Sequence, residues 1–313
     1  MERDSPRIAL HIALPIPGRA GVGNAVIAYY RGDHARAFRE FSAAAAQGDP
    51  VAQCNFGLMY LEGRGVAQDY VEAVSWLHRA AEQGQAEAQF NLGQIYHKGA
   101  GVAQDYAEAV LWYRRAAAQG YLTAESSLAM MYREGYGVAQ DHVEAANWYR
   151  RAAARGLAEA QFNLAQLHRR GQGVALDYTK AIQWYRCAAA QGHPMAQYTL
   201  GAMYAKGKGV AQDHAEAASW YRRAAEQGLP LAQFNLGMLY ENGKGIPRDL
   251  AQSYAWYRLT AARLARGPAR DKATRDRDRI AQRLSAEELA RANALLQKME
   301  KKIDFAPPAA PTQ

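Results

Sequence analysis

All six tryptophans of the chain fall on one period of 36 residues. They are Trp76, Trp112, Trp148, Trp184, Trp220 and Trp256. The string Gly-Val-Ala-Gln-Asp begins at Gly65 and recurs, identical or slightly varied, on the same period. A fixed period of this length is the sequence signature of a repeat array, in which each unit packs only on its neighbours. The sequence therefore predicts six copies of one 36-residue unit, starting at residue 49.

Each unit is predicted to contain two helices. The first helix places small and apolar residues on one face, as at Ala52, Phe56, Gly57 and Tyr60. The second helix starts at an acidic cap such as Asp69, ends before a glycine such as Gly84, and carries an apolar stripe at i, i+3, i+4 and i+7. That stripe is Ala73, Trp76, Leu77 and Ala80. The predicted fold class is all-α, an α/α solenoid formed as a superhelix of stacked antiparallel helix pairs.

The period also divides the chain. Residues 1–23 are predicted to be a disordered or degraded leader, because the apolar run from Ile8 to Ile16 is interrupted by His11 and Pro15. The solenoid spans 24–266, with a truncated first pair at 24–48. Capping helices follow at 267–305, and a disordered Pro- and Ala-rich tail follows at 306–313. The last helix could instead lie on a membrane surface, but its polar face mixes Glu with Lys, which favours a cap.

The chain carries a formal net charge of +8 and has a pI of about 9.4. Such a balance raises the question of nucleic-acid binding, yet the basic residues are spread along the array instead of clustered. Many arginines share one column, for example Arg79 and Arg115, which indicates a structural role. We therefore expect no nucleic-acid partner. We also expect no membrane span, since no apolar stretch is long enough.

The repeat resembles the Sel-one-like (SLR-type) branch of the tetratricopeptide repeats. The shared pattern is Ala-Gln-Phe-Asn-Leu-Gly-x-x-Tyr, then Gly-x-Gly-Val-x-x-Asp-Tyr-x-x-Ala, then Trp-Tyr-Arg-x-Ala-Ala, over residues 49–258. The resemblance implies a bacterial-type protein-interaction scaffold whose first helices line a concave face. One cysteine-rich bacterial subgroup has been linked to β-lactam binding, so a β-lactamase-like or cell-wall-acting protein is the alternative.

The residues favour the scaffold. That subgroup staples each repeat with a cysteine pair, whereas this chain has only Cys54 and Cys187, which lie in different repeats and are not expected to form a disulfide. No nucleophile, phosphate-loop or dinucleotide motif is present, and the histidines lack metal-ligand spacing. We expect no enzyme activity, no metal and no cofactor. The expected location is cytoplasmic by default, or periplasmic if the N-terminus is a misassigned signal peptide.

Two sets of first-helix residues are candidates for binding. A column is the set of residues at one position of the repeat. Columns that change between repeats indicate contact with solvent or a partner, because residues that pack between equivalent repeats are expected to stay the same. The predicted surface combines such variable positions with aromatic residues of a neighbouring column, one turn before them. It comprises Phe90, Gln94, Met130, Arg133, Phe162, Gln166, Arg169, Tyr198, Lys206, Phe234 and Met238. Its arginines and lysine would attract an acidic protein or peptide, although unconstrained surface explains the variation equally well. A recurring asparagine could grip a partner's backbone or bond to a neighbouring helix; its members are Asn55, Asn91, Asn163 and Asn235.

Overall fold

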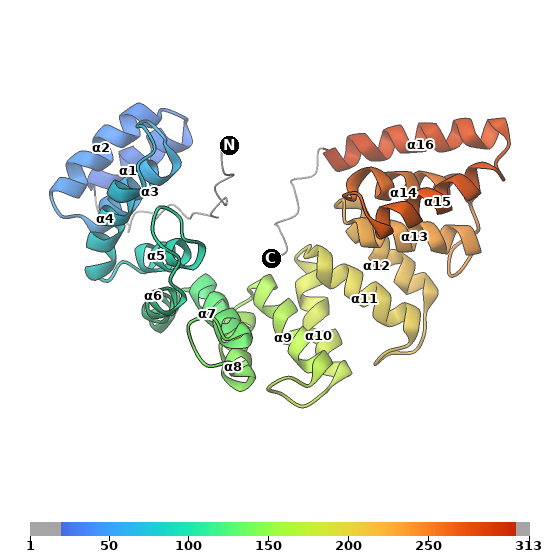
Figure 1. Cartoon of the computed structure of the whole chain (residues 1–313), viewed down its shortest axis with the longest axis horizontal. Coiled ribbons are helices and arrows are strands. Elements are labelled where there is room, and N and C mark those ends of the chain that lie inside the picture. The colour runs from blue at the N-terminus through green and yellow to red at the C-terminus, as the bar shows by residue number, and fades with distance from the viewer. Residues whose placement is uncertain (1–19, 305–313) are drawn as a thin grey trace. The chain divides into compact units, whose positions relative to one another are not determined.

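The structure is a computed structural model that describes residues 20–304. Within that range every element is a helix, from α1 to α16 (Figure 1), which confirms the predicted all-α fold. Of the predicted leader, residues 1–19 lie outside the described residues, and residues 20–23 are helical and belong to α1. The predicted tail, 306–313, also lies outside the described residues.

The chain forms two compact units, Met1–Arg155 and Gly156–Gln313. The first unit contains four helix pairs: α1 (Ala20–Tyr30) with α2 (His34–Ala46), α3 (Pro50–Glu62) with α4 (Tyr70–Glu82), α5 (Ala86–Lys98) with α6 (Tyr106–Ala118), and α7 (Leu122–Glu134) with α8 (His142–Ala154). The second contains three: α9 (Ala158–Arg170) with α10 (Tyr178–Ala190), α11 (Pro194–Lys206) with α12 (His214–Glu226), and α13 (Pro230–Asn242) with α14 (Leu250–Arg263).

In the six repeats, the first helices are α3, α5, α7, α9, α11 and α13, and each packs against the helix that follows it. The caps explain where the second helices start. The Asp69 carboxylate accepts hydrogen bonds from the amides of Val71 and Glu72, at 2.9 and 3.1 Å, and the equivalent aspartate caps every second helix of the six repeats. These bonds satisfy amides that have no partner inside the helix.

Close approach of the two helices in a pair requires a small residue on the first one. A Cβ atom added at Gly57 would lie 2.9 Å from the carbonyl oxygen of Ala73, so a side chain there would push α4 away. The loop between the helices is equally tight. A Cβ atom at Gly65, where φ is +76°, would lie 2.4 Å from the carbonyl oxygen of His34 in the preceding pair.

The tryptophans are less buried than the sequence predicts. Only Trp112 and Trp256 are buried, and the other four are partly exposed. The fully packed side chain is the next residue along the second helix, and this column consists of Leu77, Tyr113, Tyr149, Tyr185, Tyr221 and Tyr257. The tryptophans lie at the edge of the apolar stripe, where an arginine covers the ring. Arg79 stacks 4.4 Å above Trp76, and three further repeats repeat the contact. The arginine column therefore has a structural role, as predicted.

After α14 the repeat pattern ends. Helix α15 (Pro268–Ala281) packs on α14 through Ala273 and Ile280, which are both fully buried. Helix α16 (Ala286–Asp304) also packs on α14, and its Leu296 and Ile303 share a core cluster with Trp256. Figure 1 shows both helices beside α14 in the second unit. These two helices cover apolar surface of the last repeat that a further repeat would otherwise cover.

Candidate functional site: the surface of the first helices

A buried glutamine network determines which side of each first helix is unavailable to a partner. The amide nitrogen of Gln53 donates to the carbonyl oxygen of Ala45 on the preceding second helix, at 3.2 Å. The amide of Gln83, at the end of α4, donates to Gln53 Oε1 at 2.7 Å. The same pairing joins Gln119 to Gln89, Gln191 to Gln161, and Gln227 to Gln197. This side of each first helix is therefore committed to contacts between helices.

One repeat replaces both partners of this network. Glu125 stands where the other repeats have glutamine, and its side chain is only 1% exposed. The guanidinium of Arg151 lies 3.0 Å from its Oε1 atom, and that of Arg155 lies 3.8 Å away. Arg155 also donates to the carbonyl oxygen of Gly120, at 2.7 Å. A buried carboxylate needs such partners to offset its lost hydration, so the exchange preserves the contact in charged form.

The asparagine column is buried instead of presented to a partner. Asn55, Asn91 and Asn163 are buried, and Asn235 is partly buried. The Asn91 side chain lies beside the Cys54 thiol, and the Asn235 side chain lies beside the hydroxyl of Tyr221. Asn163 donates to Glu159 Oε1 at 2.9 Å. The hypothesis that these asparagines bind a partner's backbone is therefore wrong for the three buried ones, because their side chains lie inside the solenoid.

The prediction that aromatic residues of the first helices contact a partner is also partly wrong. Phe90 is 2% exposed, and its ring centroid lies 5.9 Å from that of Tyr113 and 5.2 Å from that of Tyr121. Phe162 is buried against Tyr185 and His193 in the same way. These two rings fill the space between a helix pair and the cap of the next, so they cannot anchor a partner. Tyr198 and Phe234 remain partly exposed.

The remaining predicted residues define what we call the first-helix face: Gln94, Met130 and Arg133 in the first unit, and Gln166, Arg169, Tyr198, Lys206, Phe234 and Met238 in the second. All of them keep some exposed side chain, and Lys206 and Met238 are exposed. The face therefore mixes apolar and basic side chains within each unit.

Neighbouring groups hold the basic residues of this face in place. Arg169 donates to Gln166 Oε1 at 2.7 Å, and the Tyr185 hydroxyl donates to the same oxygen at 3.1 Å. Burial raises the pKa of Tyr185 to about 12, so its hydroxyl keeps the proton that it donates. Arg133 lies 2.6 Å from Glu134 and 5.9 Å from the Tyr149 ring centroid. Ordered guanidinium groups lose less side-chain entropy when they bind a carboxylate.

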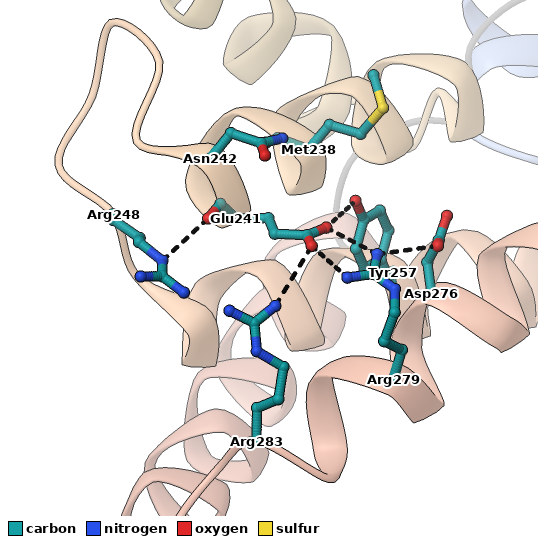
Figure 2. Close-up of polar contacts among 8 residues, drawn as sticks. All are labelled: Met238, Glu241, Asn242, Arg248, Tyr257, Asp276, Arg279 and Arg283. Carbon is teal, nitrogen blue, oxygen red and sulfur yellow. Dashed lines mark hydrogen bonds and ion pairs between the residues drawn. The ribbon is translucent and has the colours of Figure 1, made fainter.

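The sequence analysis did not single out Glu241, which stands in the repeat column of Arg133 and Arg169. Its carboxylate accepts hydrogen bonds from the Tyr257 hydroxyl at 3.0 Å and from both terminal nitrogens of Arg279 on α15 (Figure 2). Arg283 Nη1 lies 3.6 Å from Glu241 Oε1. The hydrogen bond from Arg279 is the main reason why the pKa of Glu241 is held below its ordinary value. The acidic member of this column is therefore already paired with the capping helix.

Among residues 20–304 there is no group of three His, Cys, Asp or Glu side chains that could hold a metal ion. In the same range, no helix has both the length and the hydropathy that a membrane span requires. Cys54 is buried and Cys187 is exposed, and both are free thiols.

Antiparallel helix pairs on a 36-residue period, joined by repeated polar contacts, define an α-helical repeat protein. The Sel1 repeat family model matches residues 50–85, 86–121, 123–157, 158–193, 194–229 and 230–263. The chain belongs to the Sel1 repeat family, which confirms the resemblance seen in the sequence.

Similar solved structures come from bacteria. A Sel1 repeat protein from Oxalobacter formigenes is 33% identical, with a TM-score of 0.71, and the match covers 80% of this chain and 100% of that chain. A protective antigen present in uropathogenic Escherichia coli strains, which displays an SLR fold, is 29% identical with a TM-score of 0.48, over 92% of this chain and 85% of that chain. No curated protein matches the chain.

Proposed function

We propose that this chain is a non-catalytic scaffold that binds partner proteins through the first-helix face. Sel1 repeat proteins typically mediate protein–protein interactions. The observation that supports this face is its contrast with the rest of each first helix. The glutamine and aliphatic columns and three of the asparagines are buried in contacts between helices. The columns of Met130 and Arg133 change from repeat to repeat and are at least partly exposed in every repeat after the first, where Leu58 and Leu61 are buried.

The side chains on this face suit protein recognition better than small-molecule chemistry. Arginine and methionine are enriched at protein interfaces, where arginine supplies directional hydrogen bonds and methionine adapts its shape. Arg133, Arg169 and Lys206 carry positive charge on the face, so the expected partner is acidic there. Electrostatic attraction of this kind mainly raises the association rate, and it weakens with salt.

A charge-reversal experiment tests the proposal. The immobilised chain is used to capture proteins from a bacterial lysate, and the captured proteins are identified by mass spectrometry. The variant Arg133→Glu/Arg169→Glu/Lys206→Glu should lose at least one protein that the unmodified chain retains reproducibly. A matched control, Arg31→Glu/Lys298→Glu/Lys301→Glu, makes the same charge change at exposed positions away from the face and should retain it. Identical capture by all three chains would contradict the assignment of the face.

A further inference from the structure

Helix α13 carries an apolar stripe that its neighbours leave open. Leu231, Phe234, Met238 and Glu241 follow one another at i, i+3, i+7 and i+10, which places them on one side of the helix. Leu231 is 49% exposed and Met238 is 36% exposed, and both are among the few large apolar side chains of the described residues that face solvent. An apolar stripe with a polar border is typical of a protein-binding surface.

Basic residues of the capping helix line one border of this stripe. Lys272 Nζ lies 4.9 Å from the centroid of the Phe234 ring, and Arg279 binds Glu241. Both are exposed residues of α15, so the helix that covers the last repeat also adds positive charge to its first helix. Figure 2 shows Met238 on α13, one turn before Glu241.

Arg279 and Arg283 both lie beside Glu241, and a third arginine, Arg248, contacts the same residue from the loop before α14. In four other repeats a glutamine at this position donates to the carbonyl of the first helix: Gln68, Gln104, Gln140 and Gln212. Arg248 replaces it and keeps the bond, donating from Nε to the carbonyl oxygen of Glu241 at 3.1 Å (Figure 2). The structural contact needs only a donor, so the charge of Arg248 is additional to it.

The exposed charge at this position is positive. The Glu241 side chain is 12% exposed, whereas those of Arg279 and Arg283 are 47% and 40% exposed. Arg279 also lies 3.0 Å from Asp276, so the two carboxylates of Glu241 and Asp276 balance Arg279 and Arg283. Arg248, which donates to a backbone carbonyl, adds one positive charge. Lys272 raises the surplus to two. An approaching molecule therefore meets guanidinium groups beside an apolar stripe.

We propose that α13 and α15 form a docking surface for an acidic amphipathic segment of a partner protein. Its apolar side chains pack on Leu231 and Met238, and its carboxylates bind Arg248, Arg279 and Arg283. Planar guanidinium groups bind carboxylates through paired hydrogen bonds, which suits this recognition. The Glu241 carboxylate then competes with the partner's carboxylates for binding to Arg279 and Arg283. The inference deepens the proposed function, on which it rests, by naming the partner's chemistry and one place where it binds.

Random peptides displayed on phage and selected on the immobilised full chain provide the probe. Selected peptides should be rich in Asp and Glu interspersed with apolar residues, and a synthetic copy of the best one should bind more weakly as salt is raised. Met238→Glu should weaken binding of this peptide about tenfold or more, because it replaces an apolar contact by a negative charge that repels the acidic peptide.

The decisive variant is Glu241→Gln, which keeps a hydrogen-bonding side chain but removes the competing charge. It should bind the acidic peptide about tenfold more tightly, the gain expected from freeing one charge-assisted hydrogen bond. If these ion pairs serve only to fix α15, the variant lowers thermal stability and brings no gain in affinity, which overturns the inference. Glu62→Gln, in the first unit, is the matched control: it removes the same charge from a glutamate that also binds an arginine and a tyrosine hydroxyl, and it should leave the affinity unchanged.

The other outcomes also decide between the two proposals. Selected peptides that ignore Met238→Glu and Glu241→Gln but lose binding to the Arg133/Arg169/Lys206 variant would support the first-helix face and overturn docking on α13 and α15. Failure to select any peptide would count against both. Self-association that Met238→Glu abolishes, or tighter binding of a single-stranded oligonucleotide than of any acidic peptide, would assign the surface to another occupant and overturn the inference.

Discussion

At the scale of single residues, two adjacent aromatics of each second helix have different roles. Tyr185 is fully buried and bonds to Gln166, whereas Trp184 is partly exposed. In four other repeats an arginine covers the tryptophan ring, but here Cys187 occupies that column, so no guanidinium of this column covers Trp184. The larger and rarer side chain is therefore the less buried one in this repeat.

Replacing these two residues should show the difference directly. Tyr185→Ala should lower the free energy of unfolding by about 3–5 kcal/mol, because it empties a closed site in the core. Trp184→Ala should lower it by only about 1–2 kcal/mol, since part of the ring already faces water. Urea denaturation followed by circular dichroism measures both. A larger loss for Trp184→Ala would show that the tryptophan column is the true core.

The sequence predicted the apolar stripes but not the polar pairs between helices. Helical periodicity assigns Gln53 and Gln83 to separate helices without indicating that their amides meet. The available signal was a coordinated change, because Glu125 and Arg155 replace the two glutamine columns in the same repeat. Phe90 misled for a related reason. Its aromatic column lies one turn before the variable positions, but its ring packs against Tyr121, the cap residue of the next repeat, and helical periodicity does not indicate that contact.

At the scale of elements, the repeat helices were predictable because their signals are local. Aspartate caps, terminal glycines and a 3.6-residue apolar period all lie within one helix. The placement of α15 was not predictable in this way. Its charged sequence resembles a solvated helix, and its position depends on contacts such as that of Arg279 with Glu241, 38 residues away in the chain.

Acid should weaken the attachment of α15. The hydrogen bond and charge of Arg279 lower the pKa of Glu241 in the folded chain, so its carboxylate binds protons less readily there than in the unfolded chain. The resulting stabilisation is complete above the ordinary pKa of 4.5 and is lost as pH falls through the lower, folded value.

The measurement compares unfolding free energies of the unmodified chain and of Glu241→Gln from about pH 6 to about pH 3.5. The unmodified chain should be the more stable one at the upper end. The difference should shrink steadily with acid, since the glutamine side chain of the variant remains uncharged throughout. Parallel pH profiles would show that another group is responsible.

At the scale of the whole molecule, the contacts of each repeat recur 36 residues further on. The stability of such an array is approximately a sum of repeat and interface terms, so no single repeat is required for folding. Deleting residues 121–156 joins Gly120 to Leu157 in register and removes Glu125, Arg151 and Arg155 together. No buried charge is left without its partner.

This deletion should therefore leave a folded chain. Circular dichroism should show a helical signal per residue close to that of the full chain, and heating should give a cooperative transition. A second deletion of the same length, residues 130–165, also preserves the period but joins α7 to α9, so that it keeps the buried Glu125 and removes Arg151 and Arg155. It should fold with a lower melting temperature than the first. A random coil from both deletions would contradict the additive description.

The contact between Glu125 and Arg155 has a consequence for how such a gene can change. Unequal recombination between repeats can lengthen or shorten the array by whole periods, and most breakpoints join one glutamine column to another. One product of a crossover between codons 125 and 155 instead keeps the buried carboxylate of Glu125 opposite a glutamine and without its two arginines. Descendants with that junction would carry a folding defect, so this segment should be inherited as a block while its neighbours are exchanged freely.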